Sequence, residues 1–237
     1  MSNTKMRRTQ LAFAIAFVCL ETILFILIQC SGGLRERVFS FSSVAVAALF
    51  ALVFTIKRKE SVFTSVALLF TVCADVCLVL MAEQQRLLAM IFFSAVQTFY
   101  FLRILLENDG KRLKATHISV RVSTVLFALF LTLIVLGENA DALSLISMIY
   151  FASLIVNIVF AFFNFKKSPL LALGLVFFSL CDVLVGLSLI DMYIPIAVDS
   201  IIYKLTHTEF NLIWTFYVPS QTLIALSNLF LIKNKAE

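Results

Sequence analysis

The sequence predicts an all-α polytopic membrane protein with eight transmembrane helices. Of its 237 residues, 62% are hydrophobic and only 14% are charged, whereas a soluble domain has about 25% charged residues. Its 3 Pro and 6 Gly are too few for a turn-rich β fold or a disordered chain. Stretches such as LAFAIAFVCL, residues 11–20, are apolar on every face and lack the alternation of a membrane β-strand. The composition therefore favours a helical bundle in a bilayer.

The eight helices follow from the lengths of the apolar runs. A helix rises 1.5 Å per residue and needs about 20 apolar residues to cross about 30 Å of hydrocarbon. The runs are Leu11–Cys30, Val38–Ile56, Val62–Met81, Leu87–Leu106, Ile118–Leu136, Leu143–Phe163, Pro169–Ile190 and Ile213–Ile232. The segments between them are short except Asp191 to Leu212. We therefore expect one integral membrane domain over residues 1–237.

Three of these segments need separate interpretation. The first run follows a basic stretch like that of a signal peptide, but its length and the lack of an A-x-A site predict a retained helix. Pro219 lies inside the last run and predicts a kink there. The segment from Asp191 to Leu212 is expected to be a solvated connector, with a short interfacial helix or lid as the alternative.

The Lys and Arg residues between the runs predict the orientation. Thirteen lie on the side of the N-terminus and four on the other side. The thirteen are Lys5, Arg7, Arg8, Lys57, Arg58, Lys59, Lys111, Arg112, Lys114, Lys166, Lys167, Lys233 and Lys235, and the four are Arg35, Arg37, Arg86 and Lys204. Cytoplasmic loops accumulate Lys and Arg, so both termini are expected in the cytoplasm of a multi-pass cell-membrane protein. The net charge of +5 is divided among separate clusters, so we expect no nucleic-acid partner.

The cysteines and histidines predict no metal site and no cofactor. All five Cys lie in or at the ends of apolar runs, where Cys acts as a small hydrophobe. Cys73 and Cys77 are one turn apart but have no His or further Cys at metal-ligand spacing. His117 and His207 both lie outside the predicted runs.

Five charged residues lie within the runs, and they are the strongest candidates for function. They are Glu21, Asp75, Arg103, Arg121 and Asp182. Both arginines are near the predicted inner ends of their helices, where long side chains can extend to the interface. The three acids remain, and each costs about 2.5–3.5 kcal/mol at the membrane centre, so a functional reason is expected.

Counting along the helices places two acids at one depth. Asp75 is 13 residues past Val62, and Asp182 is 13 past Pro169. Each carboxyl group is therefore about 20 Å from the inner surface. Glu21, 10 residues past Leu11, can join them, or it can be a lone carboxyl group held neutral by a neighbouring helix.

Polar residues of the antiparallel helices reach a similar depth. Gln97 and Gln221 are about 12–15 Å from the outer face, with Tyr100 and Tyr217 on their respective helix faces. We expect a polar, hydrogen-bonding chamber inside the bundle. The alternative for Gln97, Tyr100 and Gln221 is hydrogen bonding between helices, worth about 0.6 kcal/mol each.

The sequence around the two aspartates partly repeats. LLFTVCADVCLVL at residues 68–80 aligns with LVFFSLCDVLVGL at residues 175–187, with five identities that include Asp75 and Asp182. The frequency of Phe, Val and Leu explains most of these identities. A true repeat predicts two parallel four-helix halves.

Four stretches together resemble the YhhN-like lysoplasmalogenase membrane family. They are ALLFTVCADVCLVL, FFSAVQTFYFL, LALGLVFFSLCDVLVGL and FYVPSQTLIALS. The family pattern places its functional residues at Asp75, at Gln97 with Tyr100, at Asp182, and at Tyr217 with Gln221. The chain differs from the pattern at Ala74, where Gly is usual, at Cys181, where Ser is usual, and at Gln97, where the family has an imidazole.

This resemblance implies hydrolysis of the vinyl ether of a lysoplasmalogen to a fatty aldehyde and a glycerophospho-ethanolamine or -choline. The partner would be a lysophospholipid within the bilayer. Such chemistry needs one protonated carboxyl group and one carboxylate, and two aspartates at one depth suit this division. Asp75 and Asp182 are thus the expected acid/base pair. Gln97 and Gln221 would orient the substrate, with Tyr100, Tyr217 and Glu21 as further binding residues.

Two other classes of function stay open from the sequence. Intramembrane acids in two related halves also occur in proton-coupled transporters of lipids or small molecules. The runs lack the paired Gly and Pro interruptions that broken transporter helices show. A structural or regulatory membrane protein with a satisfied polar core is the third possibility.

Overall fold

The protein is an all-α bundle, as the sequence predicts. The computed structural model describes residues 3–55, 59–81, 85–108, 110–190, 193, 195–197, 199–208 and 210–230, with side chains from Arg8 onward except that of Lys59. The helices are α1 (Asn3–Cys30), α2 (Leu34–Val53), α3 (Lys59–Asp75), π-helix η1 (Val76–Leu80), α4 (Arg86–Glu107), α5 (Lys111–Leu136), 3₁₀-helix η2 (Gly137–Asn139), α6 (Ala142–Phe163), α7 (Pro169–Leu189), α8 (Ile201–Thr206) and α9 (Leu212–Leu229). No strand occurs in the described ranges.

Seven of the helices, α1 to α7, are long and apolar enough to cross a membrane. The eighth predicted span corresponds to α9, which has 18 residues and is continuous through Pro219. Its sequence is less apolar because it carries polar side chains such as Gln221, Ser227 and Asn228, all of which are buried. Since these side chains face other helices, a low mean hydropathy is expected even of a helix inside the bundle. That α9 crosses the membrane stays a prediction.

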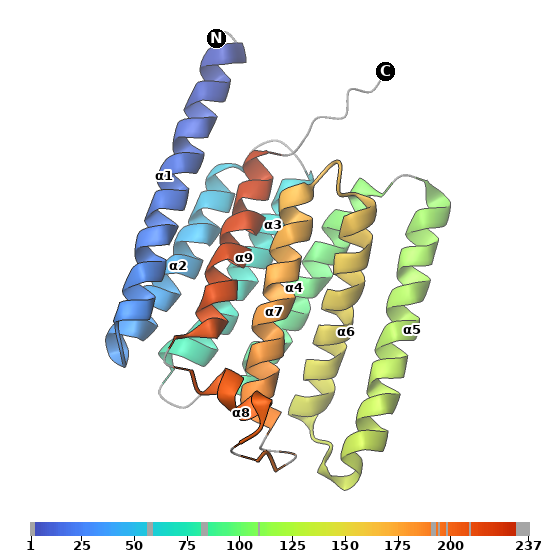
Figure 1. Ribbon diagram of the computed structural model, residues 1–237. Coiled ribbons are helices and arrows are strands. Elements are labelled where there is room, and N and C mark those ends of the chain that lie inside the picture. The colour runs from blue at the N-terminus through green and yellow to red at the C-terminus, as the bar shows by residue number, and fades with distance from the viewer. Residues whose placement is uncertain are drawn as a thin grey trace.

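Consecutive long helices run up and down, so the start of α1 and the end of α9 lie at the same end of the bundle (Figure 1). We call this end the basic end and the opposite one the α8 end. The arrangement agrees with two termini on one membrane side. Several of the cations that predict the orientation, among them Lys57, Arg58 and Lys233, lie outside the described residues.

Helix α9 lies in the centre of the bundle and contacts α7, α2, α1 and α3. Its approach to α7 is close at Gly174, whose carbonyl oxygen accepts a 2.9 Å hydrogen bond from Ser220 Oγ. A Cβ at Gly174 would lie 2.7 Å from Ile224 Cγ1 and 3.2 Å from the Ser220 carbonyl oxygen. Gly174 therefore allows the two backbones to pack together.

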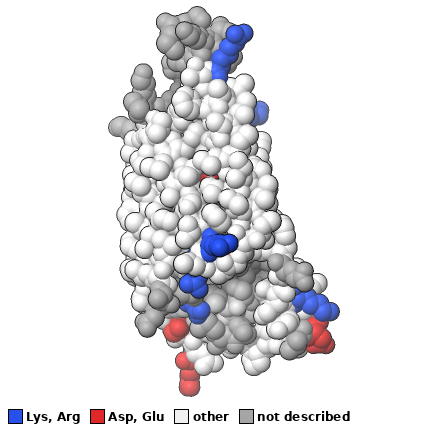
Figure 2. Space-filling model, turned by 90° about the vertical axis from the view of Figure 1, so that its left-hand side faces the viewer, with Lys and Arg blue, Asp and Glu red and all other residues white. Residues whose placement is uncertain are grey.

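The outer surface is apolar over most of its height. Figure 2 shows one face, on which uncharged residues form a broad white band with most charged atoms toward its two ends. Helix α5 lies at one edge of the bundle beside α6 (Figure 1) and exposes Phe127, Phe130 and Ile134, among others. Lipid is the natural environment for such a surface.

The helix boundaries at the α8 end follow local sequence signals. Gly137, with a φ of 53°, follows the last residue of α5. Asp141 caps α6 by accepting a 2.7 Å hydrogen bond from the Ser144 backbone N–H, and Ser144 Oγ accepts one from the Asp141 N–H. The connector before α9 contains the short helix α8, whereas its placement in solvent or at the membrane interface stays a prediction. Ser200 caps this helix by accepting from the Tyr203 N–H. Asp191 and Glu209 lie outside the described residues.

Candidate functional site

Asp75 is the last residue of α3 and is 97% buried, with 3% of its surface exposed. The hydroxyl of Tyr217 on α9 donates a 2.8 Å hydrogen bond to its Oδ2. The π-helix η1 begins at the next residue, Val76. A π-helical turn inside a helix is rare and is frequent at functional sites. No residue pattern around Asp75 predicts this change of helix type.

Asp182 lies on α7 and is partly buried. The hydroxyl of Tyr150 on α6 donates a short hydrogen bond to its Oδ2. Sequence reasoning did not identify Tyr150, although a signal was present. Tyr150 is 13 residues before Phe163, as Asp182 is 13 residues after Pro169, so depth counting places both at one level.

An aromatic cluster joins the two tyrosine–aspartate pairs. The Phe178 ring on α7 lies 5.7 Å from the Tyr217 ring and 6.5 Å from the Tyr150 ring, measured between centroids. Phe93 on α4 contacts the rings of Tyr150 and Phe178 at 5.6 and 6.0 Å. Helices α3, α6, α7 and α9 carry the two tyrosine–aspartate pairs and α4 adds Phe93, so five helices meet around this cluster.

Gln97 on α4 is fully buried and contacts α6. Asn157 Nδ2 donates to the Gln97 backbone carbonyl at 2.9 Å and to Gln97 Oε1 at 3.0 Å. Asn157 Oδ1 in turn accepts a 3.2 Å hydrogen bond from Arg121, whose guanidinium lies 4.7 Å from the centre of the Phe101 ring. Gln97 is therefore partly engaged between helices, while its Nε2 has no hydrogen-bond partner among the described residues.

Gln221 and Tyr100 are both fully buried. Neither polar atom of the Gln221 amide has a direct hydrogen bond to a described residue, and the Tyr100 hydroxyl lies beside Thr71 on α3. Gln221 follows Tyr217 by one helical turn, and Tyr100 interacts electrostatically with Tyr150. A buried polar group without a partner costs about 1–3 kcal/mol. The Gln221 amide atoms can therefore bind a polar guest close to the aspartates.

Glu21 lies on α1 and is also buried. Its Oε2 accepts a 2.5 Å hydrogen bond from Ser43 Oγ on α2. No contact with either aspartate is among those described. The structure thus brings Glu21 Oε2 to α2, whereas its Oε1 has no hydrogen-bond partner among the described residues.

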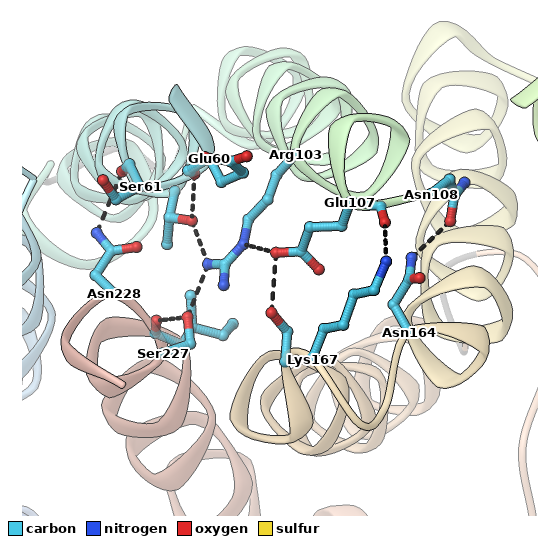
Figure 3. A network of polar contacts seen from close by, with 12 residues as sticks. Glu60, Ser61, Arg103, Glu107, Asn108, Asn164, Lys167, Ser227 and Asn228 are labelled. Carbon is cyan, nitrogen blue, oxygen red and sulfur yellow. Dashed lines mark hydrogen bonds and ion pairs between the residues drawn. The ribbon is translucent and has the colours of Figure 1, made fainter. Parts of the chain in front are cut away.

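Arg103 corrects the expectation that it extends to the interface, because its side chain is fully buried. Its Nε pairs with Glu107 Oε1 at 3.1 Å, and its Nη1 donates to Ser227 Oγ at 2.7 Å and to Thr64 Oγ1 (Figure 3). Ser168 Oγ also donates to Glu107 Oε1, at 2.9 Å. The carboxylate one turn away and the hydroxyl groups of α3 and α9 compensate the buried charge.

Arg121 and His117 also turn toward the bundle. Arg121 contacts Asn157 rather than the interface. His117 was expected outside a membrane span, but α5 begins at Lys111 and buries it completely. The His117 ring stacks on Phe160 at 3.9 Å, and its Nδ1 lies 3.4 Å from Asn108 Nδ2. The Lys111–Thr116 stretch is polar, so a hydropathy count places the start of this helix later, at Ile118, than the structure does.

Two pockets lie apart from the aspartates. A pocket of about 260 Å³ lies at the α8 end and another of about 520 Å³ lies beside Lys166 at the basic end, and neither is lined by Asp75 or Asp182. Within the described ranges, no three His, Cys, Asp or Glu side chains gather in a way that could hold a metal ion.

The internal repeat is not evident in the partners of the two aspartates. Asp75 is bound by a tyrosine of α9 and Asp182 by a tyrosine of α6. A repeat that superposes α3 on α7 would superpose α2 on α6 and α4 on α9. The two tyrosines therefore do not correspond, and the repeat stays a prediction.

Neither a search of curated proteins nor a search of solved structures found a match. The model of the YhhN family matches residues 36–228. This range runs from the start of α2 nearly to the end of α9 and includes both aspartates and both tyrosines that bind them. The chain therefore belongs to the YhhN family.

Proposed function

We propose that the chain is a lysoplasmalogenase-like membrane hydrolase that opens the vinyl ether of a lysoplasmalogen. The YhhN family includes lysoplasmalogenases. The observation that carries the proposal is the pair of interior aspartates, each bound by a tyrosine and joined through Phe178. An interior pair of acids in a lipid-facing bundle suits a reaction that needs an acid and a base at a lipid's polar end.

The reaction would begin with a proton. One aspartic acid donates its proton to the vinyl carbon remote from the ether oxygen, and the positive charge formed on the neighbouring carbon is stabilised by that oxygen. The other carboxylate takes a proton from water as the water oxygen bonds to this carbon. The resulting hemiacetal gives its hydroxyl proton to the first aspartate as its bond to the glycerol oxygen breaks, and the glycerol oxygen takes the proton held by the second aspartate. The products are a fatty aldehyde and the glycerophospho-alcohol, and one water is consumed.

The surrounding residues have supporting roles in this proposal. Tyr217 and Tyr150 hold the two carboxyl groups in position. The unpartnered amide atoms of Gln97 and Gln221 orient the water and the ether oxygen, and Tyr100 lines the site. A simple amide cannot carry a proton, so with Gln97 in place of an imidazole the two aspartates carry out the proton transfers.

The lysophospholipid would enter from the bilayer. We propose that the protein lies in the cell membrane with the basic end in the cytoplasm, as the distribution of Lys and Arg predicts. The aldehyde chain would then leave along the apolar surface of the helices.

The test is aldehyde release in deuterated water. Purified protein given lysoplasmenyl-ethanolamine should release a fatty aldehyde that carries one deuterium on the carbon next to the carbonyl, because that carbon is the one protonated. A saturated alkyl ether of the same length should remain intact. Absence of aldehyde, together with movement of substrate or protons across protein-containing liposomes, would replace the hydrolase with the transporter.

A further inference from the structure

The pocket at the α8 end is separate from the aspartates and has a defined lining. It forms where α1 ends, α2 begins, α7 ends and the α8 connector leads into α9, and its volume is about 260 Å³. We call it the α8 pocket. Its polar lining includes Gln29, Ser31, Glu36, Ser188, Thr206 and Asn211.

The charge of the α8 pocket is negative. Glu36 is the one charged side chain among the described residues that line it. Phe210, Leu205 and Leu212 supply apolar walls. A carboxylate between hydroxyl, amide and apolar groups suits an organic cation and disfavours an isolated phosphate.

The Glu36 carboxylate is held in place from α9. Asn211 Nδ2 donates a 2.8 Å hydrogen bond to Glu36 Oε1. Asn211 is itself fixed, because its side chain caps α9 at the Trp214 N–H and its backbone exchanges two 3.0 Å hydrogen bonds with the Gln29 amide. A carboxylate can accept about four hydrogen bonds, so Glu36 retains capacity for a cation.

The α8 pocket is also close to the aspartates along the helices. Leu184, which lines it, is two residues after Asp182, and Ser188 is six after it. These steps correspond to about 3 and 9 Å along α7. On α9, the lining residue Ile213 precedes Tyr217 by one turn. A lipid headgroup in the pocket would thus place its glycerol ether toward the aspartate pair.

We propose that the α8 pocket binds the ammonium group of a lysophospholipid headgroup, with Glu36 as the counter-charge. This inference rests on the proposed function for its substrate class and adds the site that recognises the headgroup. It also assigns substrate entry to the membrane leaflet at the α8 end.

The first test measures binding without catalysis. Protein in nanodiscs is titrated with 1-O-alkyl-lysophosphatidylethanolamine, whose saturated ether resists this hydrolysis, and with the matched lipid that has a glycerol headgroup. Glu36→Gln keeps the oxygen that accepts from Asn211 and removes the charge. We expect it to weaken binding of the ethanolamine lipid about fivefold and to leave the glycerol lipid unchanged. Glu36→Asp should restore part of the loss.

Two controls distinguish headgroup recognition by Glu36 from a structural role of its charge and from binding of a soluble amine. Glu138→Gln removes a charge from an exposed residue at the same end of the bundle, in η2, and should change neither affinity. Free ethanolamine, added at concentrations at which the ethanolamine lipid saturates the protein, should not displace that lipid. If it competes equally well, the pocket takes a soluble amine and the lipid assignment is wrong.

The inference is overturned if wild-type protein binds both lipids equally, or if Glu36→Gln weakens both alike. Its failure can be told apart from that of the proposed function. Wild-type protein that releases aldehyde but shows no headgroup preference refutes only the α8 pocket. Charge-dependent binding without aldehyde release refutes only the hydrolase.

Discussion

The hydroxyl of Tyr217 lies 2.8 Å from Oδ2 of Asp75 and joins α9 to the residue at which α3 changes into a π-helix. The same Tyr217 ring contacts Phe178, which leads on to the second pair, Tyr150 and Asp182. The position of Asp75 therefore depends on a helix that is distant in sequence.

Tyr217→Phe removes the hydroxyl and keeps the ring that packs on Phe178. Loss of a hydrogen bond to a buried carboxyl group costs about 1–3 kcal/mol, so we expect aldehyde release to slow about ten- to hundredfold. The measurement is the turnover rate of folded protein. Tyr203→Phe removes a hydroxyl from α8, outside the aspartate site, and should leave the rate unchanged. Similar rates in wild type and Tyr217→Phe would show that Asp75 does not need this bond.

Gly174→Ala should weaken the packing of α7 on α9. The new methyl group would meet the Ile224 side chain at 2.7 Å and backbone atoms of α9 at 3.2 Å, and overpacking of this kind costs about 1–3 kcal/mol. We expect a lower unfolding temperature in detergent. Gly186→Ala on the same helix has no atom within 4 Å of the new methyl and should be neutral or slightly stabilising. An unchanged unfolding temperature for Gly174→Ala would contradict this expectation, because it would mean that α7 and α9 accommodate the methyl group without loss of stability.

Arg103→Met should destabilise the protein strongly, because it leaves the Glu107 carboxylate and the hydroxyls around it without their cation. Removal of one partner of a buried ion pair costs about 3–5 kcal/mol. The double variant Arg103→Met with Glu107→Gln should be more stable than Arg103→Met alone. Arg112→Met, at an exposed position, serves as the control. Additive losses in the double variant would contradict coupling between the two residues.

Asp141 gives a pH-dependent contribution to stability outside the membrane spans. The Asp141 carboxylate accepts a hydrogen bond from the Ser144 backbone N–H, and this bond lowers the pKa of the carboxyl group below its ordinary value of 3.8. The stabilisation is therefore present in full above the unfolded-state pKa and is lost as the pH falls through the lower folded-state pKa. We expect Asp141→Ala to lower the unfolding temperature at pH 7 and this difference to shrink below about pH 4. A difference that stays constant down to pH 2 would assign the loss to something other than the charged cap.

The helices could be predicted from the sequence because long apolar runs have few alternatives in a bilayer. Asp75, Asp182, Gln97, Tyr100, Tyr217, Gln221 and Glu21 were all recognised as polar residues inside spans, and each is at least partly buried. Depth could be counted along each helix. The class of fold and the levels of the candidate residues were therefore accessible without a structure.

The rotation of each helix about its own axis could not be predicted from the sequence. A helix that is apolar on every face does not indicate which side meets its neighbours. The bond from Tyr150 to Asp182, the contact of Glu21 with Ser43, and the burial of Arg103 and His117 all depend on that rotation. The π-helix after Asp75 depends on tertiary packing, and no residue pattern announces it.

The most direct test of the account compares aldehyde release by Asp75→Asn, Asp182→Asn and the double variant with that of wild type. Asn keeps the size of the side chain and removes its acid and base chemistry, and unfolding curves check that the variants are folded. Residues that act as one unit are not additive. The account predicts that each single variant falls to the background rate and that the double variant is no slower. Release at the wild-type rate by either folded single variant would contradict the paired-aspartate mechanism.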